Sequence, residues 1–166
     1  AAVFAQTVSV KSPDGKNEIR LMTEPVLSYS VLRSGTERVA ATPISMKIEG
    51  ADLLGGAGTK IESADTVTLK GTIRTPLYKK ASVDETANRT VVTFKGGWRV
   101  ALVARNDGVA YRFETSFPGR VKVMDEAAGV KVPEGTASAY AAYTKKWSGD
   151  PLQCSWESIY TTVTDL

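Results

Sequence analysis

Histidine is absent from this chain of 166 residues, and cysteine occurs once, as Cys154. Without histidine, neither a Ser–His–Asp triad nor a Cys–His pair can form, and histidine-ligated zinc or iron sites are excluded. A single cysteine permits no intrachain disulfide and no multi-cysteine metal site, so we interpret Cys154 as a small buried hydrophobic residue. No apolar run is long enough to cross a membrane as a helix.

Charge of either sign is scattered along the chain. The sequence has 21 Lys and Arg against 18 Asp and Glu, a net charge of +3, and its only adjacent basic pairs are Lys79-Lys80 and Lys145-Lys146. Nucleic-acid-binding proteins usually concentrate basic residues on one face or helix, so we expect no nucleic-acid partner. The length and the 42% hydrophobic content fit one domain with a substantial core.

The first six residues are typical of the end of a secretory signal. Val3-Phe4-Ala5 is a loose version of the small-residue cleavage pattern, with the cut after Ala5. We therefore expect residues 1–6 to be a signal-peptide remnant or a disordered start, and residues 7–166 to form the domain. A periplasmic or secreted location follows from this interpretation.

Alternation of apolar and polar residues is the dominant pattern. The clearest example is the segment 100–115, in which two β-type runs flank Asn106-Asp107-Gly108. These three residues tolerate the positive φ that short hairpin turns require, so we predict positive φ there. No window of about 12 residues keeps a helical period with caps at both ends. The sequence predicts an antiparallel all-β sandwich with little or no helix.

Several polar segments have structural interpretations. Gly55 to Lys60 superficially suggests a phosphate-binding loop but lacks the required spacing and helix, so we predict a plain loop. The acidic pairs Asp84-Glu85 and Asp125-Glu126 are predicted in solvated turns. Arg112 and Glu114 should share the face opposite Phe113 and form an ion pair with a neighbouring strand.

The hairpin Arg105-Asn106-Asp107-Gly108-Val109-Ala110-Tyr111-Arg112-Phe113 resembles the central hairpin of the N-terminal domain in glycoside hydrolase family 97. Residues 12–16 followed by 27–31, residues 90–94 and residues 156–160 are similar to further segments of that domain. The resemblance implies a secreted bacterial α-glycosidase with an N-terminal β-supersandwich, a catalytic (β/α)₈ barrel and a C-terminal β domain. These 166 residues contain no such barrel. The resemblance therefore implies that they are an incomplete N-terminal domain, without catalytic residues and inactive alone. Its partner would be the catalytic barrel of the same polypeptide.

The resemblance also implies a calcium ion beside the catalytic centre, with one carboxylate supplied by the N-terminal domain. The match of Trp156-Glu157-Ser158-Ile159-Tyr160 makes Glu157 the candidate metal ligand and Trp156 a candidate substrate contact. Calcium takes about 6 to 8 oxygen ligands, so we expect no tight binding to this chain alone. A plain surface glutamate is the alternative interpretation of Glu157.

Aromatic residues cluster near the C-terminal end: Tyr140, Tyr143, Trp147, Trp156 and Tyr160. They fit either core and domain-interface packing or contact with an oligo- or polysaccharide. Two other functions therefore stay open besides the glycosidase domain. One is a stand-alone carbohydrate-binding module, and the other is a structural or adhesive β-sandwich.

Overall fold

The computed structural model describes residues 6–75, 79–136, 139–141 and 161–163, and within them the regular elements are all β-strands. The strands form a five-stranded, a four-stranded and a two-stranded sheet, and neighbouring strands are antiparallel throughout. The prediction of an antiparallel all-β sandwich is confirmed. In the described residues no helix is long and apolar enough to span a membrane.

The five-stranded sheet has the order β1-β2-β3-β4-β9. Its strands are β1 (Thr7–Lys11), β2 (Asn17–Met22), β3 (Ser28–Arg33), β4 (Thr36–Ile48) and β9 (Val123–Ala128). The four-stranded sheet follows chain order, with β5 (Ile61–Arg74), β6 (Ser82–Phe94), β7 (Trp98–Arg105) and β8 (Gly108–Thr115). The chain divides into two compact units, 1–131 and 132–166, and both larger sheets belong to the first. The second unit contains β10 (Ala139–Ala141) paired with β11 (Thr161–Val163).

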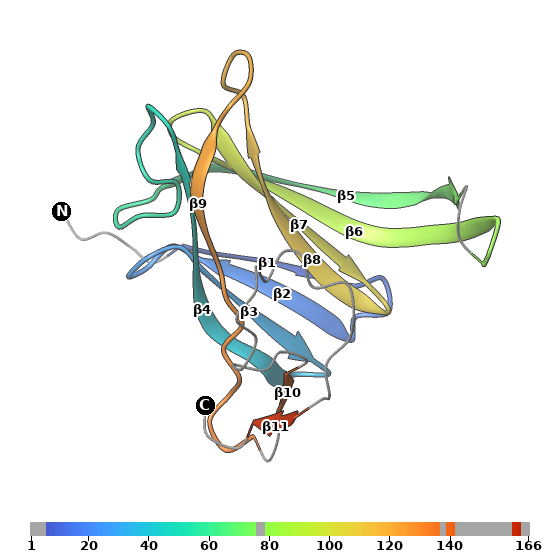
Figure 1. Cartoon of the computed structure of the whole chain (residues 1–166). Helices are drawn as coiled ribbons and strands as arrows, with labels where there is room; N and C mark the ends of the chain where they lie inside the picture. Colours follow the sequence, from blue (N-terminus) through green and yellow to red (C-terminus); the bar gives the residue numbers. More distant parts are fainter. Residues whose placement is uncertain (1–5, 76–78, 137–138, 142–160, 164–166) are drawn as a thin grey trace. The chain divides into compact units, whose positions relative to one another are not determined.

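The core lies between the two larger sheets, where β1 and β2 contact β6, β7 and β8 (Figure 1). Strand β7 shows why these residues form a sheet: Trp98, Val100, Leu102 and Ala104 are buried at every second position. Such alternation places one set of side chains in the core and the other on the opposite face. The ring of Trp98 stacks on that of Phe94 with centroids 4.1 Å apart.

The β7–β8 hairpin forms where the sequence predicts it, but with a different backbone conformation. Arg105 pairs with Gly108, so Asn106 and Asp107 form the turn. The prediction of positive φ in this turn is wrong, since the residues with positive φ lie elsewhere. Tertiary contacts hold the turn instead: Asn106 Oδ1 accepts a hydrogen bond from the backbone N–H of Asp14, at 3.1 Å.

Asn17 joins the two sheets at this end of the sandwich. Its Nδ2 donates to the carbonyl oxygens of Arg105 at 2.9 Å and Asn106 at 3.0 Å. Its Oδ1 accepts from Arg33 Nη1 at 3.0 Å, and its backbone N–H donates to Ser12 Oγ at 2.9 Å. Asn17 is only 4% exposed, so these bonds satisfy an otherwise costly buried amide.

Strands β5 and β6 continue beyond their neighbour. Their pairing runs out to Arg74 and Ser82, whereas the pairing of β6 with β7 begins at Ala87. The paired segments 70–74 and 82–86 therefore project from the four-stranded sheet as a two-stranded arm (Figure 1). Most of its side chains are exposed on both faces.

Candidate functional site

Trp156 and Glu157, the residues that the sequence singles out for substrate and calcium, lie outside the described residues, as does Cys154. Elsewhere, in the part of the chain that the structure describes, no group of three or more His, Cys, Asp or Glu side chains could hold a metal ion.

The acidic pairs lie in strands, so their predicted placement in turns is wrong. Asp84 and Glu85 belong to β6, and Asp125 and Glu126 belong to β9. Within each pair the two side chains point to opposite faces, so they do not converge. Asp84 accepts a hydrogen bond from Thr72 Oγ1, while Glu85 forms an ion pair with a neighbouring strand. Neither pair has the arrangement of a glycosidase acid and nucleophile.

The outward side of the four-stranded sheet carries a group of charged residues that we call the arginine face: Arg89, Arg99, Arg105, Arg112 and Glu114. Glu114 Oε1 lies 2.6 Å from Arg112 Nη2 and 2.9 Å from Arg89 Nη2, and its Oε2 lies 3.7 Å from Arg99 Nε. Phe113, between Arg112 and Glu114, packs against the core instead. The predicted position opposite Phe113 is therefore confirmed, and so is the ion pair with a neighbouring strand for Glu114, whereas Arg112 pairs with Glu114 of its own strand.

The arginines fix the ionisation of Glu114. Burial acts to raise its pKa, but the hydrogen bond and charge of Arg112, together with those of Arg89, outweigh burial and hold the pKa below its ordinary value. The carboxylate is thus charged at neutral pH and engaged by three guanidinium groups. It is poorly suited to act as a proton donor or a nucleophile.

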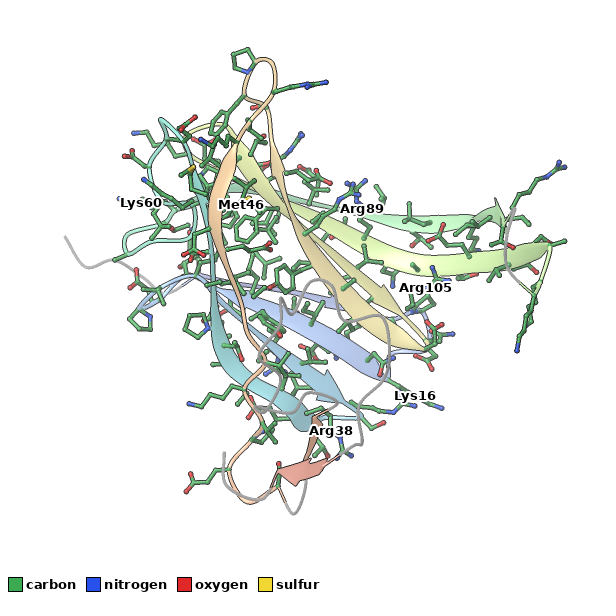
Figure 2. All side chains as sticks on the ribbon, viewed as in Figure 1. Lys16, Arg38, Met46, Lys60, Arg89 and Arg105 are labelled. Carbon is green, nitrogen blue, oxygen red and sulfur yellow. The ribbon has the colours of Figure 1, made fainter. Side chains whose placement is uncertain are left out.

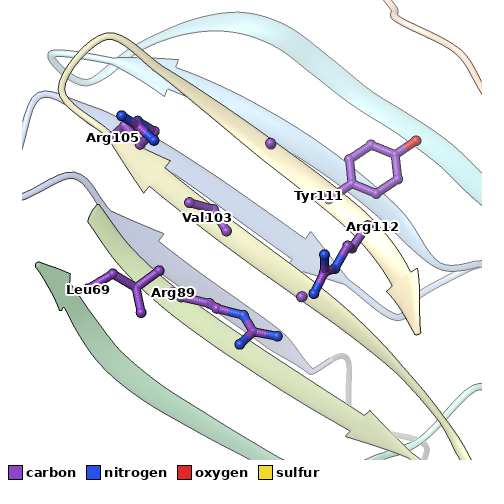
Figure 3. Close-up of a pocket in the computed structure, with 8 residues that line it drawn as sticks. Leu69, Arg89, Val103, Arg105, Tyr111 and Arg112 are labelled. Atoms are coloured by element: carbon purple, nitrogen blue, oxygen red, sulfur yellow. The ribbon is translucent and has the colours of Figure 1, made fainter. Parts of the chain in front are cut away.

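A shallow hollow of about 410 Å³ lies beside these charges. Strands β5 to β8 supply its lining: Leu69, Arg89, Ala101, Val103, Arg105, Ala110, Tyr111 and Arg112 (Figure 3). Arg89 and Arg105 project from β6 and β7 (Figure 2). Tyr111 directs its ring to Tyr29 in the core, with centroids 5.0 Å apart, and burial raises its pKa. This lining combines three arginines, each paired with a carboxylate, with aliphatic side chains and Tyr111, and it contains no carboxylate itself.

Sequence reasoning did not find the arginine face, because its members come from three strands. Arg89 and Glu114 are 25 positions apart and meet only through the sheet register. The alternation of Arg99, Ala101, Val103 and Arg105 in β7 was the available signal, since it places two arginines opposite the core residues.

Comparisons with known proteins agree on one family. The family model described as the glycosyl-hydrolase 97 N-terminal domain matches residues 10–164. A retaining alpha-galactosidase from Bacteroides thetaiotaomicron is 25% identical over 157 residues, covering 93% of this chain and 24% of that protein. A probable retaining alpha-galactosidase from Streptomyces bingchenggensis is 30% identical over 146 residues, covering 84% of this chain and 22% of that protein.

Solved structures share the fold. A glycoside hydrolase family 97 enzyme in complex with acarbose, from Pseudoalteromonas sp. strain K8, matches with a TM-score of 0.75 at 19% identity. The match covers 95% of this chain and 24% of that one. A beta-arabinopyranosidase matches with a TM-score of 0.75 at 21% identity, covering 93% of this chain and 26% of that one. The chain thus spans about a quarter of each of these proteins.

Proposed function

Because this chain belongs to the glycosyl-hydrolase 97 N-terminal family, we propose that it is the non-catalytic N-terminal domain of a secreted α-glycosidase. The observation that carries the proposal is the match of the family model to residues 10–164, in a chain that spans only 24% and 22% of two alpha-galactosidase relatives. In the proposal the chain packs on a (β/α)₈ barrel of the same polypeptide and forms part of the substrate cleft. The periplasm or the cell exterior is the proposed location.

The carboxylates of the described residues support a non-catalytic role. Hydrolysis of a glycosidic bond needs two carboxyl groups about 5 to 10 Å apart, one able to donate a proton. Glu114 is held as a charged carboxylate by arginines, and the acids of each neighbouring pair in β6 and β9 point apart. We therefore assign the catalytic carboxylates to the proposed barrel.

Strand β9 supports packing against another part of the polypeptide. It is the last strand of the five-stranded sheet, and all of its residues are exposed. Val123 and Met124 are 48% and 53% exposed. Edge strands with exposed apolar side chains are normally covered, because they otherwise pair with foreign chains.

In the proposal, Glu157 supplies one calcium ligand beside the catalytic centre, and Trp156 contacts the substrate. The remaining calcium ligands come from the barrel, since one carboxylate cannot satisfy the ion and the described residues offer no further cluster. Bound there, calcium would act as a fixed positive charge within the cleft.

Reading the coding frame beyond Leu166 is the first test, followed by assay of the full-length enzyme. We expect a continuation that alternates strands and helices, and α-glycoside hydrolysis that requires added calcium. Glu157→Gln should raise the calcium concentration needed for half-maximal activity by at least about tenfold. Asp107→Asn, at an exposed turn, is the matched control and should leave it unchanged.

Three results would contradict the proposal. A stop codon directly after Leu166 would remove the catalytic partner and favour a carbohydrate-binding or adhesive module. Unaltered calcium dependence in Glu157→Gln would remove Glu157 from the site. Full activity of the barrel after deletion of residues 7–166 would exclude a part for this domain in the cleft.

A further inference from the structure

Strand β5 forms a free edge of the four-stranded sheet. The order of that sheet is β5-β6-β7-β8, so β5 pairs with β6 on one side and, among the described residues, with no strand on the other (Figure 1). β5 has 14 residues, whereas the other edge strands of the two larger sheets, β1, β9 and β8, have 5, 6 and 8. An edge strand presents unpaired backbone N–H and C=O groups to any chain that can align with it. β5 therefore offers a long template for a further strand.

The edge of β5 lacks several features that commonly keep edge strands apart. Natural edge strands are often short, or are interrupted by proline or by a bulge. β5 contains no proline, and its register shift relative to β6, between Ile61 and Ser63, lies at its beginning. There the side-chain oxygen of Gln6 accepts a hydrogen bond from the N–H of Ile61, at 3.0 Å. Residues 62–74 are exposed apart from Leu69, which is half-buried, so this segment is accessible to a partner strand.

The charges of this segment are segregated along the strand. Glu62 and Asp65 lie in its first half, and Lys70 and Arg74 lie in its second half. A second copy aligned in parallel would place like charges together, whereas an antiparallel copy brings the acidic half of each strand to the basic half of the other. In the described part of the chain, neither Glu62 nor Arg74 has an ion-pair partner. The charge pattern therefore fits a second, antiparallel copy of β5.

Symmetry limits the registers that two copies of β5 can adopt. A two-fold axis perpendicular to the sheet keeps every side chain on its own face, so paired residues must be an even number of positions apart. With the axis at Thr68, Glu62 of each copy lies opposite Arg74 of the other, and Val67 lies opposite Leu69. An axis at Val67 or at Leu69 would separate Glu62 from Arg74. The register centred on Thr68 is thus the one that matches opposite charges.

We propose that two copies of this chain associate through β5, antiparallel and about a two-fold axis at Thr68, so that their four-stranded sheets become one continuous sheet. Backbone hydrogen bonds supply the affinity, and the charged and apolar pairs, each present twice, fix the register. The contact is narrow compared with the roughly 1,200 Å² of small stable interfaces, so we expect a dimer that dissociates on dilution, with a dissociation constant of about 10–500 µM. It leaves β9, at the edge of the five-stranded sheet, free for the proposed barrel.

Sedimentation equilibrium of the chain of residues 1–166, at concentrations on both sides of that constant, tests the charge pairing. Glu62→Arg and Arg74→Glu should each weaken the dimer by about tenfold, because each substitution places two pairs of like charges opposite each other. The double variant Glu62→Arg/Arg74→Glu has opposite charges in both pairs again and should recover the parent affinity. Glu37→Arg and Arg38→Glu, at exposed positions of β4, change the net charge by the same amounts and should leave the affinity unchanged.

Disulfide trapping tests the register. In a chain that also carries Cys154→Ala, Thr68→Cys places two thiols at the axis, where the Cα atoms of directly opposed residues are about 4.5–5.5 Å apart and within the span of a disulfide. Mild oxidation should therefore link the two copies. Lys70→Cys is the matched control, because its two copies would lie about 13 Å apart along the strands and should stay unlinked.

Each outcome bears on the dimer independently of any glycosidase activity. A chain that is monomeric at every concentration would overturn the proposal, and so would a dimer that neither charge reversal weakens or that the double variant fails to recover. Equal cross-linking of Thr68→Cys and Lys70→Cys would exclude the register centred on Thr68. Unaltered melting temperatures of Glu62→Arg and Arg74→Glu would assign their weaker association to the β5 contact and not to unfolding.

Discussion

Gly55 is predicted to be the least replaceable glycine of the β4–β5 loop. It is buried, its φ is +87°, and its carbonyl oxygen accepts a hydrogen bond from Leu27 N at 3.3 Å. A Cβ at this position would lie 2.5 Å from the carbonyl oxygen of Ile44 and 3.3 Å from Leu27 Cβ. Gly58, in the same loop, has a φ of +76° but nothing within 4 Å of its Cβ position. The two glycines therefore differ in crowding and not in backbone conformation.

The expected magnitudes follow from this difference. A side chain in the left-handed region costs about 1–2 kcal/mol, and forcing extra atoms into a packed site costs about 1–3 kcal/mol more. Gly58→Ala should then lower the free energy of unfolding by about 1–2 kcal/mol, and Gly55→Ala by about 2–5 kcal/mol. The smaller backbone entropy of alanine in the unfolded chain acts equally on both variants and cancels in the comparison.

Urea unfolding followed by tryptophan fluorescence measures both variants against the parent chain. The decisive quantity is how much more Gly55→Ala lowers the free energy of unfolding than Gly58→Ala does, which should be about 1–3 kcal/mol. Equal decreases in the free energy of unfolding would refute the close approach of Gly55 to the Ile44 carbonyl. The loop would then be an unpacked connection, as its glycine content alone suggests.

Three further predictions concern the sheets. Asn17→Ala should cost about 2–4 kcal/mol in urea unfolding, because it removes both donors to the β7–β8 turn and leaves its acceptors unpaired. Glu114 has a pKa below the ordinary carboxyl value of 4.5, so its ion pairs stabilise the fold above that pH and this contribution is lost as the pH falls through the lowered pKa. The loss of stability below pH 4.5 should accordingly be smaller in Glu114→Gln than in the exposed control Glu37→Gln. Leu102→Ala should cost about 2–5 kcal/mol, whereas Val67→Ala, at a side chain that is 51% exposed, should change the melting temperature little.

The part of the fold that the sequence predicts is the part with one buried face. Strand β7 alternates core residues with arginines, alanine and valine, so its period of two is visible in the printed letters. The turn at Gly96-Gly97 is equally visible, and both glycines have positive φ, at +100° and +80°. Burial on one side imposes a pattern that a single sequence can show.

The strands that sequence reasoning missed have no such constraint. Residues 82–86 belong to the projecting arm and 123–128 to β9; every residue of β9 is exposed, and in 82–86 none is fully buried. Without a buried face, no alternation distinguishes a strand from a turn, and acidic pairs then favour the turn interpretation. The long-range contacts were beyond prediction for a different reason, since Asn17 reaches Arg105 across 88 positions and only the packing of two sheets brings them together.

The two strand segments that the sequence did not predict also support the proposed domain packing. A strand normally forms because its neighbours bury at least one of its faces, yet β9 exposes every residue and the arm at 82–86 pairs on one side only. A two-stranded ribbon standing alone is marginally stable in water. Their regular pairing is therefore best explained if further protein covers them, as the proposed barrel would. Hydrogen exchange provides the comparison: the backbone amides of 82–86 and 123–128 should exchange much faster in the isolated chain than in the full-length enzyme, while those of Val100 and Leu102 should be protected in both. Equal exchange in the two proteins would mean that these surfaces face solvent and that the domain packs through another face.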